Sequence, residues 1–334
     1  MKKLTEIKIF SGRSHLKLAE EICRKLNREL SLKKVEDYGN ACLEVILWEK
    51  VKGCKVFLIQ TSVPQTLHRD LEELRQMINA AKENGASEII VVMPYVSYAR
   101  SDKEKSDKKY ISGMAIAGKL LIELLKESGT VETKIGEKVI RVNKMTSFIG
   151  VDFHSKKFEK FLLELDVRAY HLSALPLIAE YLKTKHTGDG IVLSSDEGAL
   201  DKTVLLAKKL GLPVGVARKK RIDDKTVIIE DIVGEVSGKD VIIFDDEISP
   251  AATTLKALAK ELEKLGAKSI TAVVTHASFM QETVGSLQEI KILREIVVTD
   301  TVPIPEEARR LLPLRVLSVA GLIAETIKEI SEES

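Results

Sequence analysis

Residues 241–254 read VIIFDDEISPAATT: an apolar run, two neighbouring aspartates and a loop of small residues. The apolar run is typical of a central strand in a parallel sheet, and residues 255–265 then repeat apolar side chains at helical spacing. Ligands of open α/β sheets collect at such a junction. Asp245 and Asp246 can accept hydrogen bonds from sugar hydroxyls there, and N–H groups at a helix N-terminus can bind phosphate. The stretch therefore predicts an α/β fold with a site suited to a sugar phosphate.

The same alternation of apolar runs and amphipathic helices extends along the chain. Strands are predicted at residues 7–10, 56–59, 88–93, 148–152, 190–194, 214–217, 241–244, 269–275 and 296–299. Helices are predicted at residues 15–30, 67–84, 172–184, 199–210, 254–265 and 316–331. Short crossovers between the strands favour parallel sheets. The sequence therefore predicts an α/β fold of two domains, with a boundary near residue 155.

The composition is that of a soluble enzyme. The 334 residues are 44% hydrophobic and 31% charged, and their formal net charge of +2 provides no overall basic field for nucleic acid. The N-terminus lacks the apolar core of a signal peptide, and no run of about 18 apolar residues suits a membrane span. The odd set of Cys23, Cys42 and Cys54 has no metal-binding spacing and fits a reducing compartment. We expect a cytoplasmic protein with no nucleic-acid partner and no membrane partner.

A polar segment, YVSYARSDKEKSDKK at residues 95–109, follows the strand predicted at 88–93. Its many charges are typical of a solvated loop. Arg100, however, comes just past the carboxyl end of a strand, where α/β sheets bind ligands. An arginine at such a place can pair with phosphate or stack on a purine. The residues alone leave both interpretations open.

Two further polar clusters also follow predicted strands. His154 ends the motif VDFH at residues 151–154, and a lone histidine is more often structural than a ligand. Asp196 lies in SSDEG at residues 194–198, between a strand and a helix. Its carboxylate can hold Mg²⁺, which prefers oxygen ligands, or it can cap the helix. The position fits both roles equally well.

The segment RKKR at residues 218–221 interrupts two apolar runs with positive charge. One interpretation is a hairpin or loop with solvated charges. The other is a mobile basic arm that closes over phosphates. Transfer of phosphoryl groups depends mainly on positioning and on neutralising charge, so such an arm would suit that chemistry.

Several separated motifs together resemble the ribose-phosphate pyrophosphokinases, also called phosphoribosyl pyrophosphate synthetases. The motifs are FSG at 10–12 with LA at 18–19, FLIQT at 57–61, PY at 94–95 with YARSD at 98–102, VDFH at 151–154, SSDEG at 194–198, KKR at 219–221, DD at 245–246 with Thr253, TH at 275–276 and DTVP at 300–303. Each motif alone is weak, but their shared order is specific. The resemblance implies two phosphoribosyltransferase-like domains at residues 1–155 and 156–310, each a mostly parallel sheet flanked by helices. It also implies a C-terminal helix within residues 311–334 that packs on the first domain.

The resemblance implies roles for individual residues as well. The family positions that bind ATP match Tyr38, Arg100, Ser101, Asp102 and His154. Those that bind ribose 5-phosphate match Asp245, Asp246, Ser249, Ala251, Ala252 and Thr253. The resemblance implies Mg²⁺ held by His154 and Asp196, and catalytic roles for Lys219, Arg221 and His154.

The chain departs from the family pattern at positions with implied functions. The family motif Phe-x-Asp-Gly-Glu, which contributes to a neighbouring subunit's nucleotide site, is YGNAC at residues 38–42, so the aromatic residue remains and both carboxylates are missing. Ser101 stands where the family usually carries glutamine. In the phosphate loop, Thr-Gly-Gly-Thr becomes PAAT at residues 250–253. The proline removes a backbone donor, and each alanine resists positive φ at a cost of about 1 kcal/mol.

The implied reaction is Mg²⁺-dependent transfer of pyrophosphate from ATP to O1 of ribose 5-phosphate, which gives phosphoribosyl pyrophosphate and AMP. The departures leave two alternatives. One is a divergent enzyme on the same scaffold that uses another phosphosugar or phosphoryl donor. The other is a non-catalytic paralogue that regulates a true synthetase. Because the family forms homo-oligomers, we also expect an assembly of identical chains, a hexamer or smaller.

Overall fold

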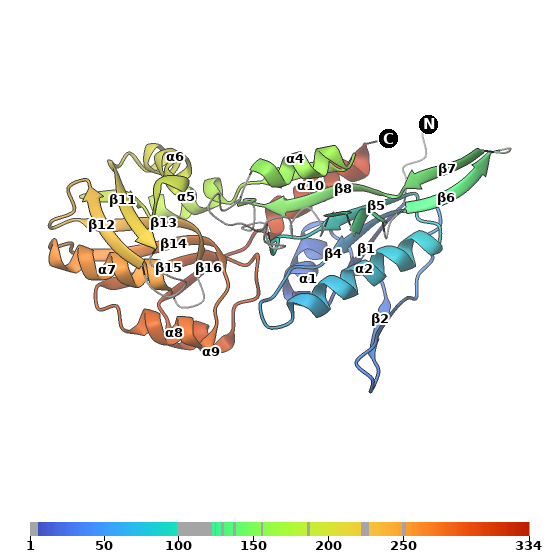
Figure 1. The fold of residues 1–334 in the computed structure, drawn as a ribbon, viewed down its shortest axis with the longest axis horizontal. Coiled ribbons are helices and arrows are strands. Elements are labelled where there is room, and N and C mark those ends of the chain that lie inside the picture. The colour runs from blue at the N-terminus through green and yellow to red at the C-terminus, as the bar shows by residue number, and fades with distance from the viewer. Residues whose placement is uncertain are drawn as a thin grey trace, which may run out of the picture. The chain divides into compact units, whose positions relative to one another are not determined.

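The computed structural model describes residues 6–98, 122–123, 125–127, 130–135, 138–154, 156–185, 188–221, 227–248 and 252–333. The chain divides into two compact units, Met1–Leu172 with Val319–Ser334, and Ser173–Ser318. Each unit contains its own main sheet and its own buried core (Figure 1).

The first unit is built on a five-stranded sheet in which every neighbouring pair is parallel. In spatial order its strands are β1 (Ile7–Ser11), β4 (Lys55–Ile59), β5 (Glu88–Val92), β8 (Met145–Val151) and β9 (Arg168–Leu172). Every residue of β4 is buried, as expected for a central strand that is covered on both faces. The apolar runs of the sequence therefore form the middle of this sheet.

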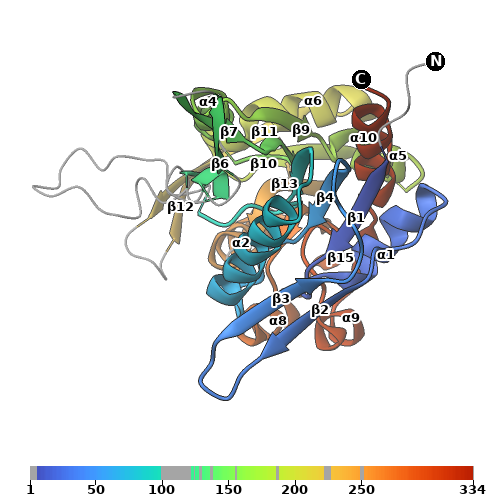
Figure 2. The ribbon, with the colours of Figure 1, turned by 90° about the vertical axis from the view of Figure 1, so that its right-hand side faces the viewer.

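Helices of the first unit pack on this sheet through their apolar faces. They include α1 (Leu16–Lys25), α2 (Leu67–Glu83), α4 (Lys156–Glu164) and α10 (Ala320–Glu332). Leu74 and Met77 of α2 share one core with Val56 and Leu58 of β4. Helix α1 packs against α10, so helices from near both ends of the chain lie side by side (Figure 2).

The pairing of the edge strands β9 and β16 (Leu314–Leu317) determines which residues belong to each unit. Strand β9 pairs along β8 and so belongs to the first unit, although the boundary predicted at residue 155 assigns it to the second domain. The segment predicted from residue 311 begins with β16, which pairs with β15 (Leu293–Thr299) in the second unit. Of that segment, only residues from Val319 onward belong to the first unit. Apolar spacing does not reveal which strands pair at the edge of a sheet. The boundaries between the units therefore fall after Leu172 and after Ser318, later than the predicted positions near 155 and at 311.

The second unit is built on a seven-stranded sheet in the order β12-β11-β10-β13-β14-β15-β16. Its other strands are β10 (Gly190–Ser194), β11 (Val214–Arg221), β12 (Val227–Val233), β13 (Asp240–Ile248) and β14 (Ser269–Ala277). Neighbouring strands are parallel except for the antiparallel pair β11 and β12. Its helices are α5 (Leu175–Lys183), α6 (Leu200–Leu210), α7 (Thr253–Lys264), α8 (Gln281–Gln288) and α9 (Glu306–Leu311).

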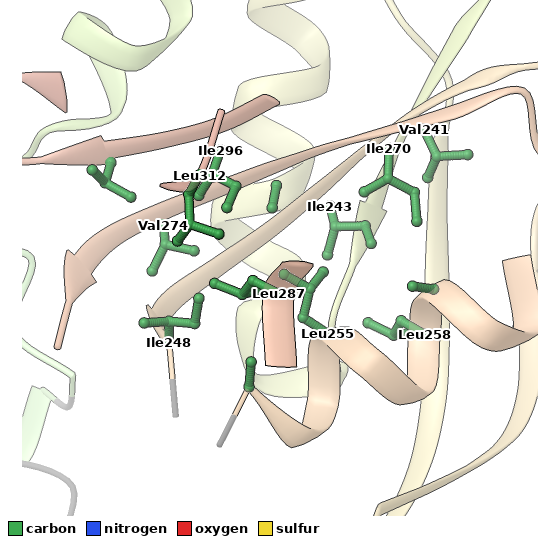
Figure 3. Close-up of a cluster of buried hydrophobic side chains, with 14 of the residues drawn as sticks. Val241, Ile243, Ile248, Leu255, Leu258, Ile270, Val274, Leu287, Ile296 and Leu312 are labelled. Atoms are coloured by element: carbon green, nitrogen blue, oxygen red, sulfur yellow. The ribbon is translucent and has the colours of Figure 1, made fainter. Parts of the chain in front are cut away.

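The core of the second unit fixes α7 directly after β13. Figure 3 shows Val241 and Ile243 of β13 in one buried cluster with Leu255 and Leu258 of α7. Alternate residues of the strand reach this cluster because successive side chains in a strand point to opposite faces. Burial of each such side chain contributes about 1.5–3 kcal/mol to folding. β13 and α7, on either side of residues 249–251, are therefore packed into the same core.

The predicted α/β class with mostly parallel sheets is confirmed, but the apolar pattern does not predict two antiparallel hairpins. They are β2 (Lys33–Asp37) with β3 (Leu43–Leu47), and β6 (Thr130–Ile135) with β7 (Lys138–Asn143). Strand β2 reads KKVED, so its structure comes from pairing with β3 rather than from its own pattern (Figure 2). Within the described ranges, no helix is long and apolar enough to cross a bilayer.

Candidate active site

Charged side chains from separate strands meet at the carboxyl end of the sheet in the second unit. Asp196 follows β10, Lys219 lies on β11 and Asp245 lies on β13. Lys219 Nζ lies 2.8 Å from Asp196 Oδ2, and the Lys219 charge also acts on the Asp245 carboxyl. Ser194 pairs with Phe244 in the register of β10 and β13, which brings the residues after Ser194 close to Asp245. Strand order therefore gathers three of the predicted site residues.

Asp196 has two partners at once. Its Oδ1 accepts a hydrogen bond of 3.0 Å from the N–H of Ala199, which caps the 3₁₀ turn Glu197–Ala199, while its Oδ2 pairs with Lys219. Burial raises the pKa of Asp196, but the hydrogen bond and charge of Lys219 outweigh burial and hold the pKa below its ordinary value. The carboxylate is therefore ionised at neutral pH. Because 38% of the side chain is exposed, it can also reach a cation.

Residues 218–221 form the end of β11, which agrees with the hairpin, the first of the two interpretations that the sequence left open for this segment. They pair with β12, and Lys219 lies opposite Ile229. The strand extends this far because antiparallel pairing satisfies its backbone even where its side chains are charged. The side chain of Arg221, like residues 222–226, lies outside the part of the chain that the structure describes.

A local irregularity in β11 separates the two neighbouring cations Arg218 and Lys219. The register shifts between them, and such a bulge re-aims side chains. Lys219 is 19% exposed and pairs with Asp196, whereas Arg218 is 60% exposed and lies 3.9 Å from Asp231. Only Lys219 of this pair contacts the candidate site.

Asp245 and Asp246 lie within β13 rather than after it. The strand continues through Ile248, because residues 247–248 still pair with β14. Asp245 Oδ1 accepts a hydrogen bond of 2.8 Å from the N–H of Asp246. Burial, reinforced by the charge of Asp246, raises the pKa of Asp245 to about 7, although Lys219 acts in the opposite direction. A carboxyl group poised near neutrality beside a lysine is typical of a functional site.

The loop with the implied phosphate-binding role ends at Ala252, immediately before α7. Ala252 is buried and has a left-handed backbone, with φ of 48° and ψ of 31°. This conformation costs a non-glycine residue about 1–2 kcal/mol and is frequent where the surroundings fix a ligand site. Thr253 begins the helix, so both described residues of this loop lie at a helix N-terminus. Ser249, Pro250 and Ala251 lie outside the described residues.

In the first unit, His154 follows β8 after a second strained residue. Asp152 is 2% exposed and has φ of 42°. His154 itself is half-buried at the carboxyl end of the sheet, the edge where α/β proteins bind ligands. Arg100, Ser101 and Asp102, which the resemblance places on the same nucleotide site, lie outside the described residues.

Tyr38 lies in the turn between β2 and β3 and is 46% exposed. Its hydroxyl donates a hydrogen bond to Glu44, and its N–H donates to the carbonyl oxygen of Cys42 at 2.9 Å. Ala41, at the place of the family's glycine, again has a positive φ, of 65°. Motif comparison misses Glu44 because it lies outside the five motif positions, and only hairpin pairing brings it to Tyr38. The turn therefore keeps an aromatic ring beside a carboxylate.

Within the described ranges, no cluster of three or more His, Cys, Asp or Glu side chains could enclose a metal ion. Mg²⁺ does not need such an enclosure, because it commonly binds one or two carboxylates together with water and substrate phosphates. The ionised, partly exposed Asp196 therefore has the chemistry of a ligand for a metal that also binds phosphate oxygens.

Carboxylates, a lysine and a helix N-terminus thus lie at the carboxyl ends of the parallel strands in the sheet of the second unit. This arrangement is typical of α/β enzymes that bind phosphorylated ligands, because the helix and the lysine attract phosphate while the carboxylates bind hydroxyls or cations. The residues that define this site belong to or follow three different strands, so no single sequence motif contains the whole site.

Comparisons with known proteins give a narrower assignment. Residues 7–129 match the N-terminal domain of ribose phosphate pyrophosphokinase, and residues 193–334 match the phosphoribosyl synthetase-associated domain. The ribose-phosphate pyrophosphokinases of Synechococcus elongatus and Bacillus caldolyticus are 32% and 33% identical to this chain over 98% of its length and over 92% and 95% of their own. The crystal structure of phosphoribosylpyrophosphate synthetase from Mycobacterium smegmatis matches with a TM-score of 0.85 and 28% identity, covering 99% of this chain and 100% of that one.

The chain belongs to the ribose-phosphate pyrophosphokinase family. It is thereby assigned to the diphosphotransferases of nucleotide biosynthesis, and the predicted pair of phosphoribosyltransferase-like domains is confirmed.

Proposed function

We propose that this protein transfers pyrophosphate from ATP to O1 of ribose 5-phosphate in a Mg²⁺-dependent reaction, giving phosphoribosyl pyrophosphate and AMP. Family membership supports the reaction class. The observation that carries the proposal is the Lys219–Asp196 ion pair of 2.8 Å beside the Asp245 carboxyl, because it places a cation and a metal-binding carboxylate next to a group suited to sugar hydroxyls.

The sugar phosphate binds along the β13–α7 junction. Asp245 and Asp246 accept hydrogen bonds from the ribose 2- and 3-hydroxyls. The 5-phosphate lies on the loop that includes Ser249, Ala251, Ala252 and Thr253, where N–H groups at the start of α7 face it. The left-handed Ala252 supports this path, because a loop that turns at this residue can present successive N–H groups to one anion.

Lys219, together with Arg221, stabilises the charge that develops on the transferred phosphates. The sugar O1 attacks the β-phosphorus in line, and the protein contributes positioning and charge rather than covalent chemistry. In the resting protein Lys219 is paired with Asp196. Substrate phosphates compete for the same ammonium group, so binding draws Lys219 from the carboxylate toward the reacting oxygens.

In this proposal Asp196 would hold Mg²⁺, and His154 is the further ligand that the resemblance implies. When bound, the metal neutralises phosphate charge and polarises the phosphoryl oxygens. Asp196 is suited to the role because it is ionised and remains partly exposed. The withdrawal of Lys219 toward the phosphates would leave Asp196 Oδ2 available for a cation.

The nucleotide side of the site comprises Tyr38, Arg100, Ser101, Asp102 and His154. Tyr38 presents an exposed ring on a projecting hairpin, which suits stacking on a purine of a neighbouring copy. We therefore propose a homo-oligomer, a hexamer or smaller. A cytoplasmic location agrees with Cys23, Cys42 and Cys54 as free thiols.

Initial rates of AMP formation test the substrate assignment. Purified protein is incubated with ATP and Mg²⁺ and with ribose 5-phosphate or other pentose and hexose phosphates. The proposal predicts that ribose 5-phosphate gives the highest kcat/KM. A higher value for another phosphosugar would identify a divergent enzyme, and binding of ATP without turnover of any sugar would identify a non-catalytic paralogue.

A further inference from the structure

A chain of polar contacts lies behind His154 in the first unit and is not used by the mechanism above. Glu159 of α4 lies 2.6 Å from His171 Nδ1, and His171 belongs to β9. On its other side, His171 Nε2 accepts a hydrogen bond of 3.0 Å from the backbone N–H of Phe153. The contacts therefore run from a helix, through a strand, to the residue that precedes His154.

The N–H donor of Phe153 fixes the direction of both hydrogen bonds made by the His171 ring. A backbone N–H can only donate, so Nε2 of His171 must carry a lone pair. The ring proton is then on Nδ1, which donates it to the Glu159 carboxylate. Glu159 thus holds His171 in the one tautomer that can accept from Phe153.

The backbone held by this contact is strained. Asp152 has φ of 42°, and its N–H donates to the carbonyl oxygen of Leu172 at 2.8 Å. A left-handed non-glycine residue persists only where its surroundings over-determine it. The hydrogen bonds to Leu172 and to its neighbour His171 fix the N–H groups of Asp152 and Phe153. Strand β9 therefore determines the path of the backbone that follows β8.

Aromatic packing also contacts this turn. The Phe153 ring stacks on the His171 imidazole, with centroids 4.6 Å apart and an interplanar angle of 28°. It also contacts Phe158 edge-on, with centroids 5.0 Å apart. His171 therefore contributes both an acceptor and a stacking face, and the two can be separated by substitution.

We propose that His171 and Glu159 are positioning residues. They fix the path of the backbone after β8 and thereby hold His154 against the phosphates of the nucleotide. This inference rests on the proposed function, in which His154 serves the ATP side of the site. Neither residue contacts substrate itself, so both act through the Phe153 peptide.

Three substitutions distinguish the role of His171 as a hydrogen-bond acceptor from the role of its aromatic ring. His171→Phe keeps an aromatic ring for stacking but removes the acceptor. His171→Gln removes the ring but retains an acceptor oxygen at nearly the same distance from the backbone. Glu159→Gln keeps an acceptor for Nδ1–H without the charge. His68→Phe on the exposed face of α2 is the matched control for the histidine-to-phenylalanine change.

Steady-state kinetics of the full-length protein then gives a readout that general destabilisation would not reproduce. For His171→Phe we expect kcat/KM for ATP to fall by about tenfold or more while KM for ribose 5-phosphate changes less than about twofold. His171→Gln should retain kcat/KM for ATP within about threefold, with Glu159→Gln between the two. Equal losses in His171→Phe and His171→Gln, a parallel rise of both KM values, or no loss in a folded His171→Phe would overturn the proposal.

Hydrogen exchange of the Phe153 amide keeps the inference testable even if the wild-type protein makes no phosphoribosyl pyrophosphate. Mass spectrometry of peptides that span residues 150–156 should show faster exchange in His171→Phe than in His171→Gln or His68→Phe. Unchanged exchange in His171→Phe would contradict the positioning role regardless of activity. Absence of turnover in the wild type with the expected exchange pattern would instead contradict only the proposed reaction.

Discussion

Ala252 holds a left-handed backbone at the point where β13 gives way to α7. For an alanine this conformation costs about 1–2 kcal/mol. Its carbonyl oxygen accepts a 2.9 Å hydrogen bond from the N–H of Lys256 in the first turn of the helix, and Leu255 is anchored in the core. The packing of α7 thus imposes the conformation. The sequence indicates strain at an alanine of this loop, and the structure shows a left-handed backbone at Ala252.

Substitutions at Ala252 measure this strain. Ala252→Val should lower the free energy of unfolding by at least about 2 kcal/mol, because a β-branched residue resists positive φ and the site is buried. Ala252→Gly should change it by less than about 1 kcal/mol, since relief of strain is offset by the greater freedom of glycine in the unfolded chain. Urea unfolding measures both values. Ala259→Val, on the same helix with ordinary helical φ, should be clearly less damaging than Ala252→Val.

The carboxyl of Asp245 should make stability depend on pH. Its pKa is about 7 in the folded protein, above its ordinary value, so the folded state favours the protonated form and loses stability as pH rises through 7. Asp245→Asn removes this loss. We expect the variant to be more stable than wild type at pH 8, by on the order of 2 kcal/mol, and the difference to shrink toward pH 4.

Asp240 on the same strand is the matched control, because its pKa is shifted in the opposite direction. The hydroxyl of Ser269, together with Lys268 and Arg294, holds the pKa of Asp240 below its ordinary value. Asp240→Asn should therefore destabilise the protein at pH 8 and lose this effect as pH falls below about 4. Thermal melts of both variants across this range provide the comparison. A more stable Asp240→Asn, or an Asp245→Asn that is less stable at pH 8, would contradict the assigned environments.

At the scale of elements, apolar runs predict the strand interiors well and the strand ends poorly. The strand predicted at 241–244 is β13, but the real strand reaches Ile248 and includes both aspartates. The strand predicted at 214–217 likewise continues as β11 through charged residues to Arg221. In both strands a neighbour supplies backbone hydrogen bonds, which stabilise strand structure whatever the side chains are. The candidate site residues Lys219, Asp245 and Asp246 lie at these ends, so residue type indicates the site better than the predicted strand bounds do.

The bulge in β11 predicts opposite outcomes for two adjacent cations. Lys219→Gln should lower kcat by about 100-fold or more, because it removes the positive charge that Lys219 is proposed to bring to the transferred phosphates. Arg218→Gln should leave kcat within about threefold, because Arg218 is exposed and lies near Asp231 instead. Rates of AMP formation at saturating substrate measure both. Similar losses in the two variants would show that the segment acts as a diffuse basic patch.

At the scale of the whole molecule, the alternating pattern and the order of motifs suffice for the fold class and the family. They do not suffice for the unit boundaries. Residues 156–172 join the first unit through the pairing of β9 with β8, and residues 311–318 join the second through β16. The hairpin of β2 and β3 is invisible for the same reason, because its stability comes from cross-strand contacts.

A buried cation contacts the end of α10 in the first unit. Lys55 of β4 is 5% exposed, and its Nζ donates to the carbonyl oxygens of Ile330 at 3.0 Å and Glu333 at 2.6 Å. These are orphan carbonyls at the end of the helix. Lys55→Met should destabilise the protein by about 1–3 kcal/mol, because it leaves them without a donor. Lys8→Met, which breaks partly exposed ion pairs of 2.9 Å to Glu49 and 3.1 Å to Glu6, should cost less than about 1 kcal/mol. Equal losses in urea unfolding would contradict this role of Lys55.

The most direct test of the proposed reaction is where on ATP the sugar attacks. Phosphorus NMR of purified protein with ATP, Mg²⁺ and ribose 5-phosphate distinguishes transfer of a pyrophosphoryl group from transfer of a single phosphoryl group. Attack at the β-phosphorus predicts AMP and phosphoribosyl pyrophosphate in equal amounts. Formation of ADP with a ribose bisphosphate, or no consumption of ATP by a protein that binds it, would contradict the account.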